Sequence, residues 1–219
     1  MIAEFRGVSF GYSDAPLFED LSCRFEEGAF YLIQGRSGIG KSTILRLMTR
    51  LENPTGGEIR FQGSALFDYD PPTLRRRIVY IQQLPTVLDA SVRQNLLLPF
   101  TFSANNDYAR PDDEELKALL ARVHLPPDGL DQNAMSLSVG QLQRVCLIRG
   151  LMLSPDMILL DEPTSALDDE SARVVQAMVE QVCSDSGITV VMVNHRAVRP
   201  QKIEPVVLKL AEGRLTEAL

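Results

Sequence analysis

Cysteine is scarce in this sequence. Among 219 residues there are only Cys23, Cys146 and Cys183. No two of them have the C-x-x-C spacing of a zinc ligand pair or a redox motif. Each lies in an apolar stretch without a neighbouring pair of cations that would activate the thiol. We therefore expect three buried thiols in a reducing compartment.

Long hydrophobic runs are also missing. No stretch approaches the roughly 18 apolar residues that cross a bilayer, and the N-terminal residues MIAEFRGVSF do not resemble a signal peptide. Basic residues are in the minority: 22 lysines and arginines face 29 acids, and the resulting net charge of −7 argues against a nucleic-acid partner. If the protein works at a membrane, another chain must supply the membrane-spanning part.

What the sequence does have is a hydrophobic content of 45%, enough for one large domain or a core domain with a smaller subdomain. Short apolar runs alternate with amphipathic stretches, which predicts an α/β fold with a parallel sheet covered by helices on both faces. The expected strands are 2–10, 30–34, 58–61, 78–81, 157–160, 188–193 and 206–210, with helices near 44–51 and 170–183.

The middle of the chain differs from the two ends. From about residue 85 to 153 the pattern is mainly helical, with helices expected at 114–124 and 138–153. We therefore predict a single domain over residues 1–219. Its core comprises about 1–84 and 155–219, and its helical subdomain about 85–154.

A glycine-rich motif follows the expected strand at 30–34. The run Gly35, Arg36, Ser37, Gly38, Ile39, Gly40, Lys41, Ser42, Thr43 matches the phosphate-loop pattern G-x-x-x-x-G-K-[ST] between a strand and a helix. Its glycines let backbone N–H groups approach phosphate oxygens, and the helix that follows directs its positive end at the same anion. Lys41 adds a charge near the β- and γ-phosphates, and Ser42 offers an oxygen to Mg²⁺. The motif predicts that ATP binds here with magnesium.

Two acids end the apolar strand at 157–160. Asp161 would lie at the carboxyl end of that strand, where α/β sheets place their ligands, and would hold Mg²⁺ largely through water. Glu162 is the candidate general base for the attacking water. Alone, the pair is as easily a solvated turn, but the phosphate loop favours the magnesium site. His195 follows the next apolar strand and could reach the γ-phosphate, although a lone histidine there is more often structural.

These motifs, in this order, resemble the ATP-binding-cassette (ABC) ATPase family over nearly the whole chain. Tyr12 matches the aromatic residue that stacks on adenine. Gln83 matches the glutamine that joins the two subdomains and touches magnesium and water, although Gln82 is adjacent to it. His195 matches the switch histidine. Residues 161–168 match the magnesium-site and dimer-contact segment of the family.

The segment LSVGQ at 137–141 resembles the family signature LSGGQ, which separates this family from other P-loop proteins. It is expected to open a helix, so that Ser138 and the N–H groups of Gly140 and Gln141 bind phosphate. In the family that phosphate belongs to the ATP of a second subunit, and two ATP molecules lie between head-to-tail subunits. The resemblance implies the same arrangement here, as a homodimer within the complex.

The resemblance further implies a P-loop NTPase fold with a mostly parallel central sheet, an N-terminal antiparallel β portion and a helical subdomain. It implies Mg²⁺-dependent ATP hydrolysis with Glu162, His195 and Gln83 as catalytic residues and with Ser42, Gln83 and Asp161 at the metal. The partner would be an integral membrane permease, which places the chain on the cytoplasmic face of the inner or plasma membrane. The segment 83–99 is most like that of bacterial iron or metal exporters.

Two positions depart from the family pattern. Val139 replaces a glycine of the signature, which is tolerable if that position needs only helical angles. Arg196 replaces the usual acid after the histidine. The alternative is a soluble ABC ATPase that acts on nucleic acid or another non-transport partner. The repair-type proteins of that class need a long coiled-coil insertion, and only about 100 residues separate Lys41 from Ser138.

Overall fold

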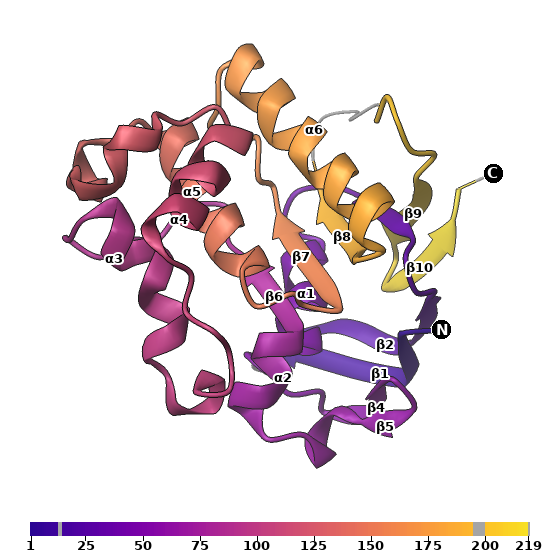
Figure 1. The fold of residues 1–219 in the computed structure, drawn as a ribbon. Helices are drawn as coiled ribbons and strands as arrows, with labels where there is room; N and C mark the ends of the chain where they lie inside the picture. Colours follow the sequence, from indigo (N-terminus) through magenta and orange to yellow (C-terminus); the bar gives the residue numbers. More distant parts are fainter. Residues whose placement is uncertain (13–14, 195–199, 219) are drawn as a thin grey trace.

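The computed structural model of the chain describes residues 1–12, 15–194 and 200–218 (Figure 1). Its larger sheet has six strands in the order β10-β9-β3-β8-β7-β6. They are β3 (Phe30–Gln34), β6 (Ile78–Ile81), β7 (Met157–Asp161), β8 (Thr189–Val193), β9 (Val206–Ala211) and β10 (Arg214–Glu217). Neighbouring strands from β9 to β6 are parallel, and β10 runs antiparallel to β9. The prediction of a mostly parallel sheet is confirmed.

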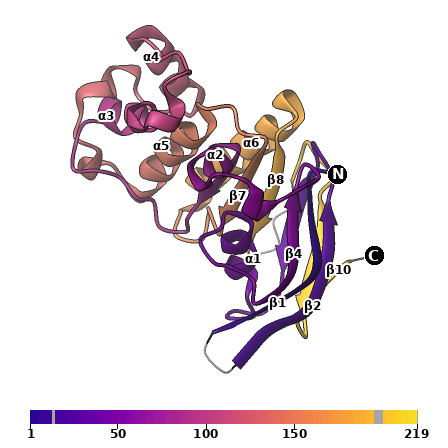
Figure 2. The same ribbon diagram turned by 90° about the horizontal axis from the view of Figure 1, so that it is seen from below.

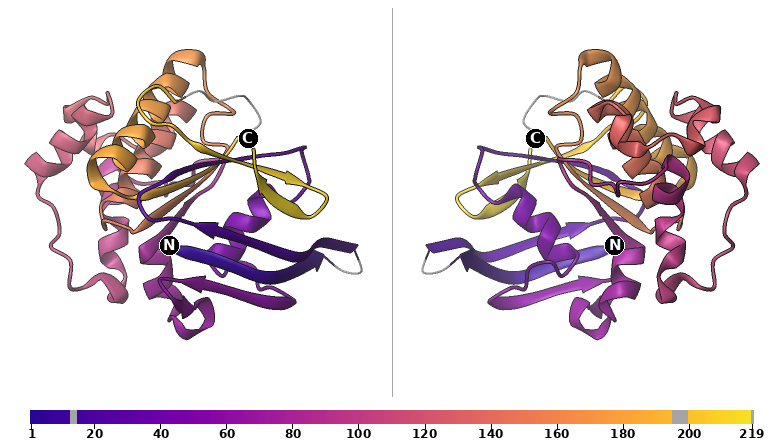
Figure 3. Two further views of the ribbon diagram at one scale, coloured as in Figure 1. Left: turned by 90° about the vertical axis from the view of Figure 1, so that its right-hand side faces the viewer. Right: turned by 90° about the vertical axis from the view of Figure 1, so that its left-hand side faces the viewer.

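Both faces of this sheet are covered, which explains why its strands are continuous apolar runs. In β3, Tyr31 and Ile33 pack on the side of α1 (Lys41–Met48). Phe30 and Leu32 point the other way, into a cluster with side chains of α5 (Val139–Leu151) and α6 (Asp169–Ser186). Figure 3 shows α1 between the two sheets, whereas α6 covers the outer face in Figure 1.

A four-stranded antiparallel sheet forms a second layer, in the order β2-β1-β4-β5. Its strands are β1 (Ala3–Tyr12), β2 (Ala15–Phe25), β4 (Gly56–Phe61) and β5 (Ser64–Ala65). Phe5, Phe25 and Phe61 pack from this sheet into the core that it shares with α1 and the larger sheet. This layer is the antiparallel N-terminal portion that the resemblance implies.

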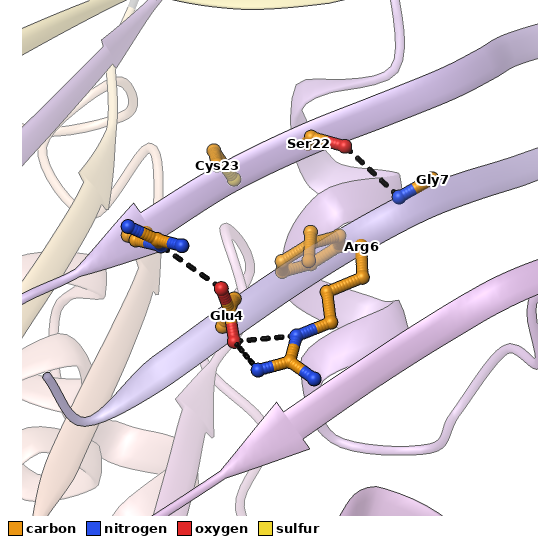
Figure 4. Close-up of a pocket in the computed structure, with 7 residues that line it drawn as sticks. Glu4, Arg6, Gly7, Ser22 and Cys23 are labelled. Atoms are coloured by element: carbon orange, nitrogen blue, oxygen red, sulfur yellow. Dashed lines mark hydrogen bonds and ion pairs between the residues drawn. The ribbon is translucent and has the colours of Figure 1, made fainter. Parts of the chain in front are cut away.

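The opposite face of the small sheet carries a buried carboxylate (Figure 4). Glu4 points away from Phe5, its neighbour in β1, because successive strand residues face opposite sides. Its Oε2 accepts a hydrogen bond from Nε of Arg6 at 2.7 Å, and its Oε1 accepts one from Nε of Arg24 at 2.9 Å. These bonds, the one from Arg6 first, lower the pKa of the Glu4 carboxyl group. Since Arg24 belongs to β2, the carboxylate ties β1 to β2.

The middle of the chain forms a helical region at one side of the molecule, away from β1 and β2 (Figure 2). It contains α3 (Val92–Leu97), α4 (Asp113–Arg122), α5 and the short 3-10 helices η2 (Leu98–Thr101), η3 (Ser103–Asn105), η4 (Pro127–Asp131) and η5 (Ala134–Ser136). A separate core, with Leu96, Leu116 and Val145 among its members, holds these helices together. In the described residues, none of the helices is both long and apolar enough to span a bilayer. The boundaries near residues 85 and 154 stay a prediction.

Several elements were not expected from the sequence, namely β2, β5, β10, α2 (Pro71–Arg77), α3 and η1 (Leu66–Asp68). β2 mixes charged and apolar residues without regular alternation, and α2 begins with two prolines and ends with three arginines, so neither has a clear period. The helix after the phosphate loop ends at Met48 rather than near 51. The hydroxyl of Thr49 donates to the carbonyl oxygens of Leu45 and Arg46, and Arg50 adopts a left-handed φ of 52°.

The fully buried Leu159 tests the packing of the central strands. We predict that Leu159→Ala lowers the free energy of unfolding by about 2–5 kcal/mol, because it removes buried apolar surface and leaves a cavity. Leu84 is 69% exposed and provides the control. Leu84→Ala should change the same quantity by less than about 0.5 kcal/mol. Urea unfolding measures both variants, and equal losses would contradict the packing described.

Candidate active site

The phosphate loop joins β3 to α1. Gly40 has a φ of 106°, which side chains disfavour, and a Cβ at this position would lie 2.6 Å from the ring of Phe18. A Cβ on Gly35 would lie 2.7 Å from the carbonyl oxygen of Leu210. The loop therefore needs glycine at both ends. Residues 36–39 lie between them, and the loop leads into the first turn of α1, whose N–H groups lack intrahelical partners and can bind an anion.

Lys41 begins α1 and turns its side chain back into the loop. Its Nζ donates hydrogen bonds to the carbonyl oxygens of Gly35 at 3.0 Å and Arg36 at 2.9 Å. The residue is only 4% exposed. Burial lowers the pKa of its ammonium group, whereas the charges of Glu162 and Asp161 act in the opposite direction. A buried cation held by two neutral carbonyls can exchange them for phosphate oxygens, which form stronger charge-assisted bonds.

Asp161 ends β7 directly beside the loop. The hydroxyl of Ser42 donates to Asp161 Oδ1 at 2.8 Å, although 119 residues separate the two in the chain. The hydroxyl of Tyr80 donates to the other carboxylate oxygen, Oδ2, at 2.8 Å. Burial, followed by the charge of Asp161, raises the pKa of Tyr80 to about 12, so the phenol keeps its proton at neutral pH. The structure thus brings the loop and the strand-end carboxylate together.

Tyr80 and Arg46 are residues of this site that the sequence analysis missed. Arg46 lies near Tyr80 and Tyr12, and its interactions with them, the one with Tyr80 first, raise the pKa of Arg46. The sequence contained one feature for each residue that could have pointed to its role. Tyr80 carries the one hydroxyl in the apolar strand IVYI. Arg46 lies one helical turn after Ser42 and so on the same face of α1.

Glu162 adopts a φ of 48°, a conformation that is uncommon for residues other than glycine. Its N–H donates to the carbonyl oxygen of Val193 in β8 at 3.0 Å, which holds the turn against the sheet. Gln83 Nε2 donates to Glu162 Oε2 at 3.3 Å and to Ser165 Oγ at 3.1 Å. Gln82 instead lines a groove between α2 and the helical region. Gln83 is therefore the glutamine that meets the candidate base.

Tyr12 lies near the end of β1, edge-on to Phe10 with ring centroids 4.9 Å apart. Its hydroxyl donates to Glu52 Oε1 at 3.3 Å. The side chain is exposed and can offer a ring face to a nucleotide base. His195 falls outside the described residues. Its neighbour Asn194 is buried, and its Nδ2 donates to Thr164 Oγ1 at 3.4 Å, so β8 ends beside the segment that follows Glu162.

The signature segment begins α5 and caps its own helix. The N–H of Gln141 donates to Ser138 Oγ at 3.3 Å, and the N–H of Ser138 donates to Gln141 Oε1 at 2.9 Å. A phosphate bound by Gln141 must therefore compete with this capping box. Val139 lies within the helix and is 45% exposed, so valine needs no left-handed angle there. Gly140 packs on α6, where a Cβ would lie 2.8 Å from Ser171 Oγ.

A glycine-rich loop between strand and helix, a buried lysine in it and a strand-end aspartate on its serine define a P-loop nucleotide-binding protein. The family model described as ABC transporter matches residues 18–165. The chain therefore belongs to the ABC transporter family, and its fold is that of the family's ATP-hydrolysing cassette.

The known proteins that are similar to it include one solved cassette and two curated relatives. The ATP-binding cassette MJ0796, solved as a dimer in a post-hydrolysis state with ADP and Pi, has a TM-score of 0.84 and 26% identity over 99% of this chain and 98% of that one. The probable iron export ATP-binding protein FetA of Escherichia coli K12 is 33% identical over 89% of this chain and 84% of its own length. The ABC-type transporter kk1G of Curvularia clavata is 34% identical over 98% of this chain and 16% of its own length. The chain spans about a sixth of the length of this transporter and of two further curated relatives that it matches.

The two left-handed glycines of the loop provide a matched pair of variants. Gly38 has a φ of 75° and nothing within 4 Å of an added Cβ, so Gly38→Ala should cost only the strain of about 1–2 kcal/mol. Gly40→Ala should cost about 1–3 kcal/mol more, because its Cβ also meets Phe18 and Leu17. Urea unfolding of both variants measures the difference. An equal loss would show that the loop does not pack on β2 as described.

Proposed function

We propose that this chain binds ATP with Mg²⁺, hydrolyses it and thereby powers a membrane transporter as its ATPase subunit. The 2.8 Å hydrogen bond from Ser42 to Asp161 carries the proposal. It puts a hydroxyl and a carboxylate, both oxygen ligands, beside the loop that receives phosphate. Membership of the ABC transporter family supports the coupling of this chemistry to transport.

The residues at this point fit a magnesium ion. Ser42 and Asp161 offer oxygen atoms, the hard ligands that Mg²⁺ prefers. Gln83 uses its amide nitrogen on Glu162 and Ser165, so its amide oxygen is the atom it would turn to the metal. When bound, the ion neutralises charge on the β- and γ-phosphates. Three protein ligands leave room for the water molecules and phosphate oxygens that complete its shell.

Binding of ATP uses the loop and one strand end. Lys41 exchanges the carbonyl oxygens of Gly35 and Arg36 for β- and γ-phosphate oxygens. Backbone N–H groups of residues 36–43 line the phosphates. Tyr12 stacks on adenine with its exposed ring.

Hydrolysis is carried out by the residues that follow β7 and β8. Glu162 accepts a proton from the attacking water as general base. Gln83 orients the Glu162 carboxylate through its 3.3 Å hydrogen bond. His195 stabilises the negative charge that develops on the γ-phosphate.

The signature segment completes a second subunit's site. Ser138, Gly140 and Gln141 bind the γ-phosphate of the ATP that the partner holds, and the capping box between Ser138 and Gln141 opens to release its donors. The exposed side chain of Val139 then lies at the interface between two copies. The dimer reported for the similar cassette MJ0796 supports a head-to-tail homodimer.

A groove of about 980 Å³ is the surface we propose for the permease. It runs between α2, β6 and the helical region, and Gln82, next to Gln83, lines it. Its walls carry the exposed Leu51 and Phe102. Three arginines also line it: Arg75, Arg76 and Arg149, whose side chains donate to backbone carbonyl oxygens. A cytoplasmic permease segment with apolar and acidic side chains complements these walls.

In this proposal the chain works on the cytoplasmic face of the membrane. Movement of a segment in the groove would reach the site through the neighbouring Gln82 and Gln83. Because the probable iron export ATP-binding protein is similar over most of both chains, iron is the first cargo to test.

Glu162→Gln tests the catalytic role. ATP binding should persist, and ATP turnover should fall by roughly 10²–10⁴, because the general base is removed without a change of size. The control is Glu212→Gln, the same exchange at an exposed glutamate that also has a φ of 48°. Steady-state ATPase rates measure both. Turnover near that of the unmodified chain would exclude Glu162 as the base.

Phe102→Asp tests the groove. The new charge removes an apolar contact and repels an acidic partner, so co-purification with detergent-solubilised membranes should weaken at least about tenfold. The ATPase rate of the isolated chain should not change. Phe67→Asp is the control, because Phe67 is exposed to a similar extent (54% against 56%) but does not line the groove. If Phe102→Asp and Phe67→Asp co-purify equally well with the same permease, the docking surface lies elsewhere.

A further inference from the structure

The magnesium carboxylate is held from two sides, and only one of its partners belongs to the phosphate loop. Ser42 donates to Asp161 Oδ1 and Tyr80 to Asp161 Oδ2, each at 2.8 Å. A serine hydroxyl has lone pairs to offer Mg²⁺ and can still donate its one proton to Oδ1. The Tyr80 hydroxyl fixes the other oxygen, Oδ2, from a different element of the fold. Together the two bonds hold both oxygens of the carboxylate.

The position of Tyr80 in the sheet explains how it reaches this carboxylate. Tyr80 of β6 pairs in register with Leu159 of β7, two residues before Asp161. Two strand residues span roughly 6–7 Å, about the length of a tyrosine side chain, and residues two apart in a strand point to the same face. A phenol at this position ends on the Asp161 carboxylate, which a shorter hydroxyl such as serine would not reach.

Arg46 extends the contact to α1. Ser42 and Arg46 are one helical turn apart and share a face of α1. Ser42 bonds Asp161, and the charged side chain of Arg46 lies near enough to Tyr80 for the two to interact. The helix thus acts on both members of the Tyr80–Asp161 pair. The cation beside the phenol oxygen strengthens the phenol as a donor to the carboxylate.

We propose that Tyr80 is a positioning residue of the magnesium site, which holds Asp161 in the orientation that receives the ion. Its role is distinct from that of the metal ligands, since it touches Asp161 and acts through it. The inference rests on the proposed function, in which Asp161 serves Mg²⁺. When a hydrogen-bond partner of a metal-binding carboxylate is removed, the affinity for the metal typically falls.

The test is Tyr80→Phe, which deletes the hydroxyl and keeps the ring. The protein is loaded with a non-hydrolysable ATP analogue, and Mn²⁺ binding is titrated by electron paramagnetic resonance. The dissociation constant for Mn²⁺ should rise roughly 10- to 100-fold. Affinity for the nucleotide in EDTA should stay within about twofold, because no metal is present for Tyr80 to act on. In ATPase assays, excess Mg²⁺ should restore most of the turnover.

Tyr69→Phe is the matched control. The Tyr69 hydroxyl also donates a hydrogen bond, to the carbonyl oxygen of Phe61 at 2.9 Å, but away from Asp161. It should leave Mn²⁺ affinity unchanged. A second variant, Arg46→Met, keeps the phenol and should raise the constant by a smaller factor, on the order of 3.

Three results would overturn the proposal. The first is unchanged Mn²⁺ affinity in Tyr80→Phe, and the second is an equal loss in Tyr69→Phe. The third is an equal loss of nucleotide affinity in EDTA, which would mean that Tyr80 supports the fold or the nucleotide instead. If the unmodified chain bound no nucleotide at all, the proposed function would fail, and this outcome is separate from the other three.

Discussion

Ser42 Oγ and Asp161 Oδ1 lie 2.8 Å apart across 119 residues of chain. That contact requires β3 and β7 to run in the same direction, so that the loop after one strand and the acid at the end of the other reach the same edge of the sheet. It also requires α1 to pack over that face. The glycines of the loop, the apolar strands and the shared core beneath α1 all serve to hold these two side chains at one point.

The elements that were predicted well from the sequence are those with a clear local pattern, either an uninterrupted apolar run or a motif with fixed spacing. The strand at 78–81 was predicted to the residue because four apolar residues stand between polar flanks. The loop was found because its glycines and lysine have a fixed spacing. β2 escaped because it pairs along an irregular edge with register shifts, and its charged residues obscure any alternation. Tyr80 and Arg46 escaped because their importance comes from a contact between separate elements, which no local pattern records.

In the proposed function, the site divides into a part that one chain completes and a part that needs a second copy. Two pairs of side chains in the first part are already hydrogen-bonded, Ser42 to Asp161 and Gln83 to Glu162. The polar groups of Ser138 and Gln141 are instead satisfied by each other at the start of their own helix. A capping box of this kind stabilises α5 while the subunit is alone. Its donors become useful to a nucleotide only when a stronger acceptor, such as a phosphate of the partner, displaces the serine and glutamine.

The buried position of Lys41 has a consequence for the thermodynamics of nucleotide exchange. Its ammonium group is drawn into the loop by the carbonyl oxygens of Gly35 and Arg36, so the loop has an internal brace before any anion arrives. When a nucleotide binds, Lys41 exchanges the carbonyl oxygens for phosphate oxygens. The loop is already ordered, so binding does not have to order it. Preorganised sites of this type lose little conformational entropy when the ligand enters. In the proposed function, filling the empty loop therefore needs chiefly a movement of the lysine head group from the two carbonyl oxygens to the phosphate.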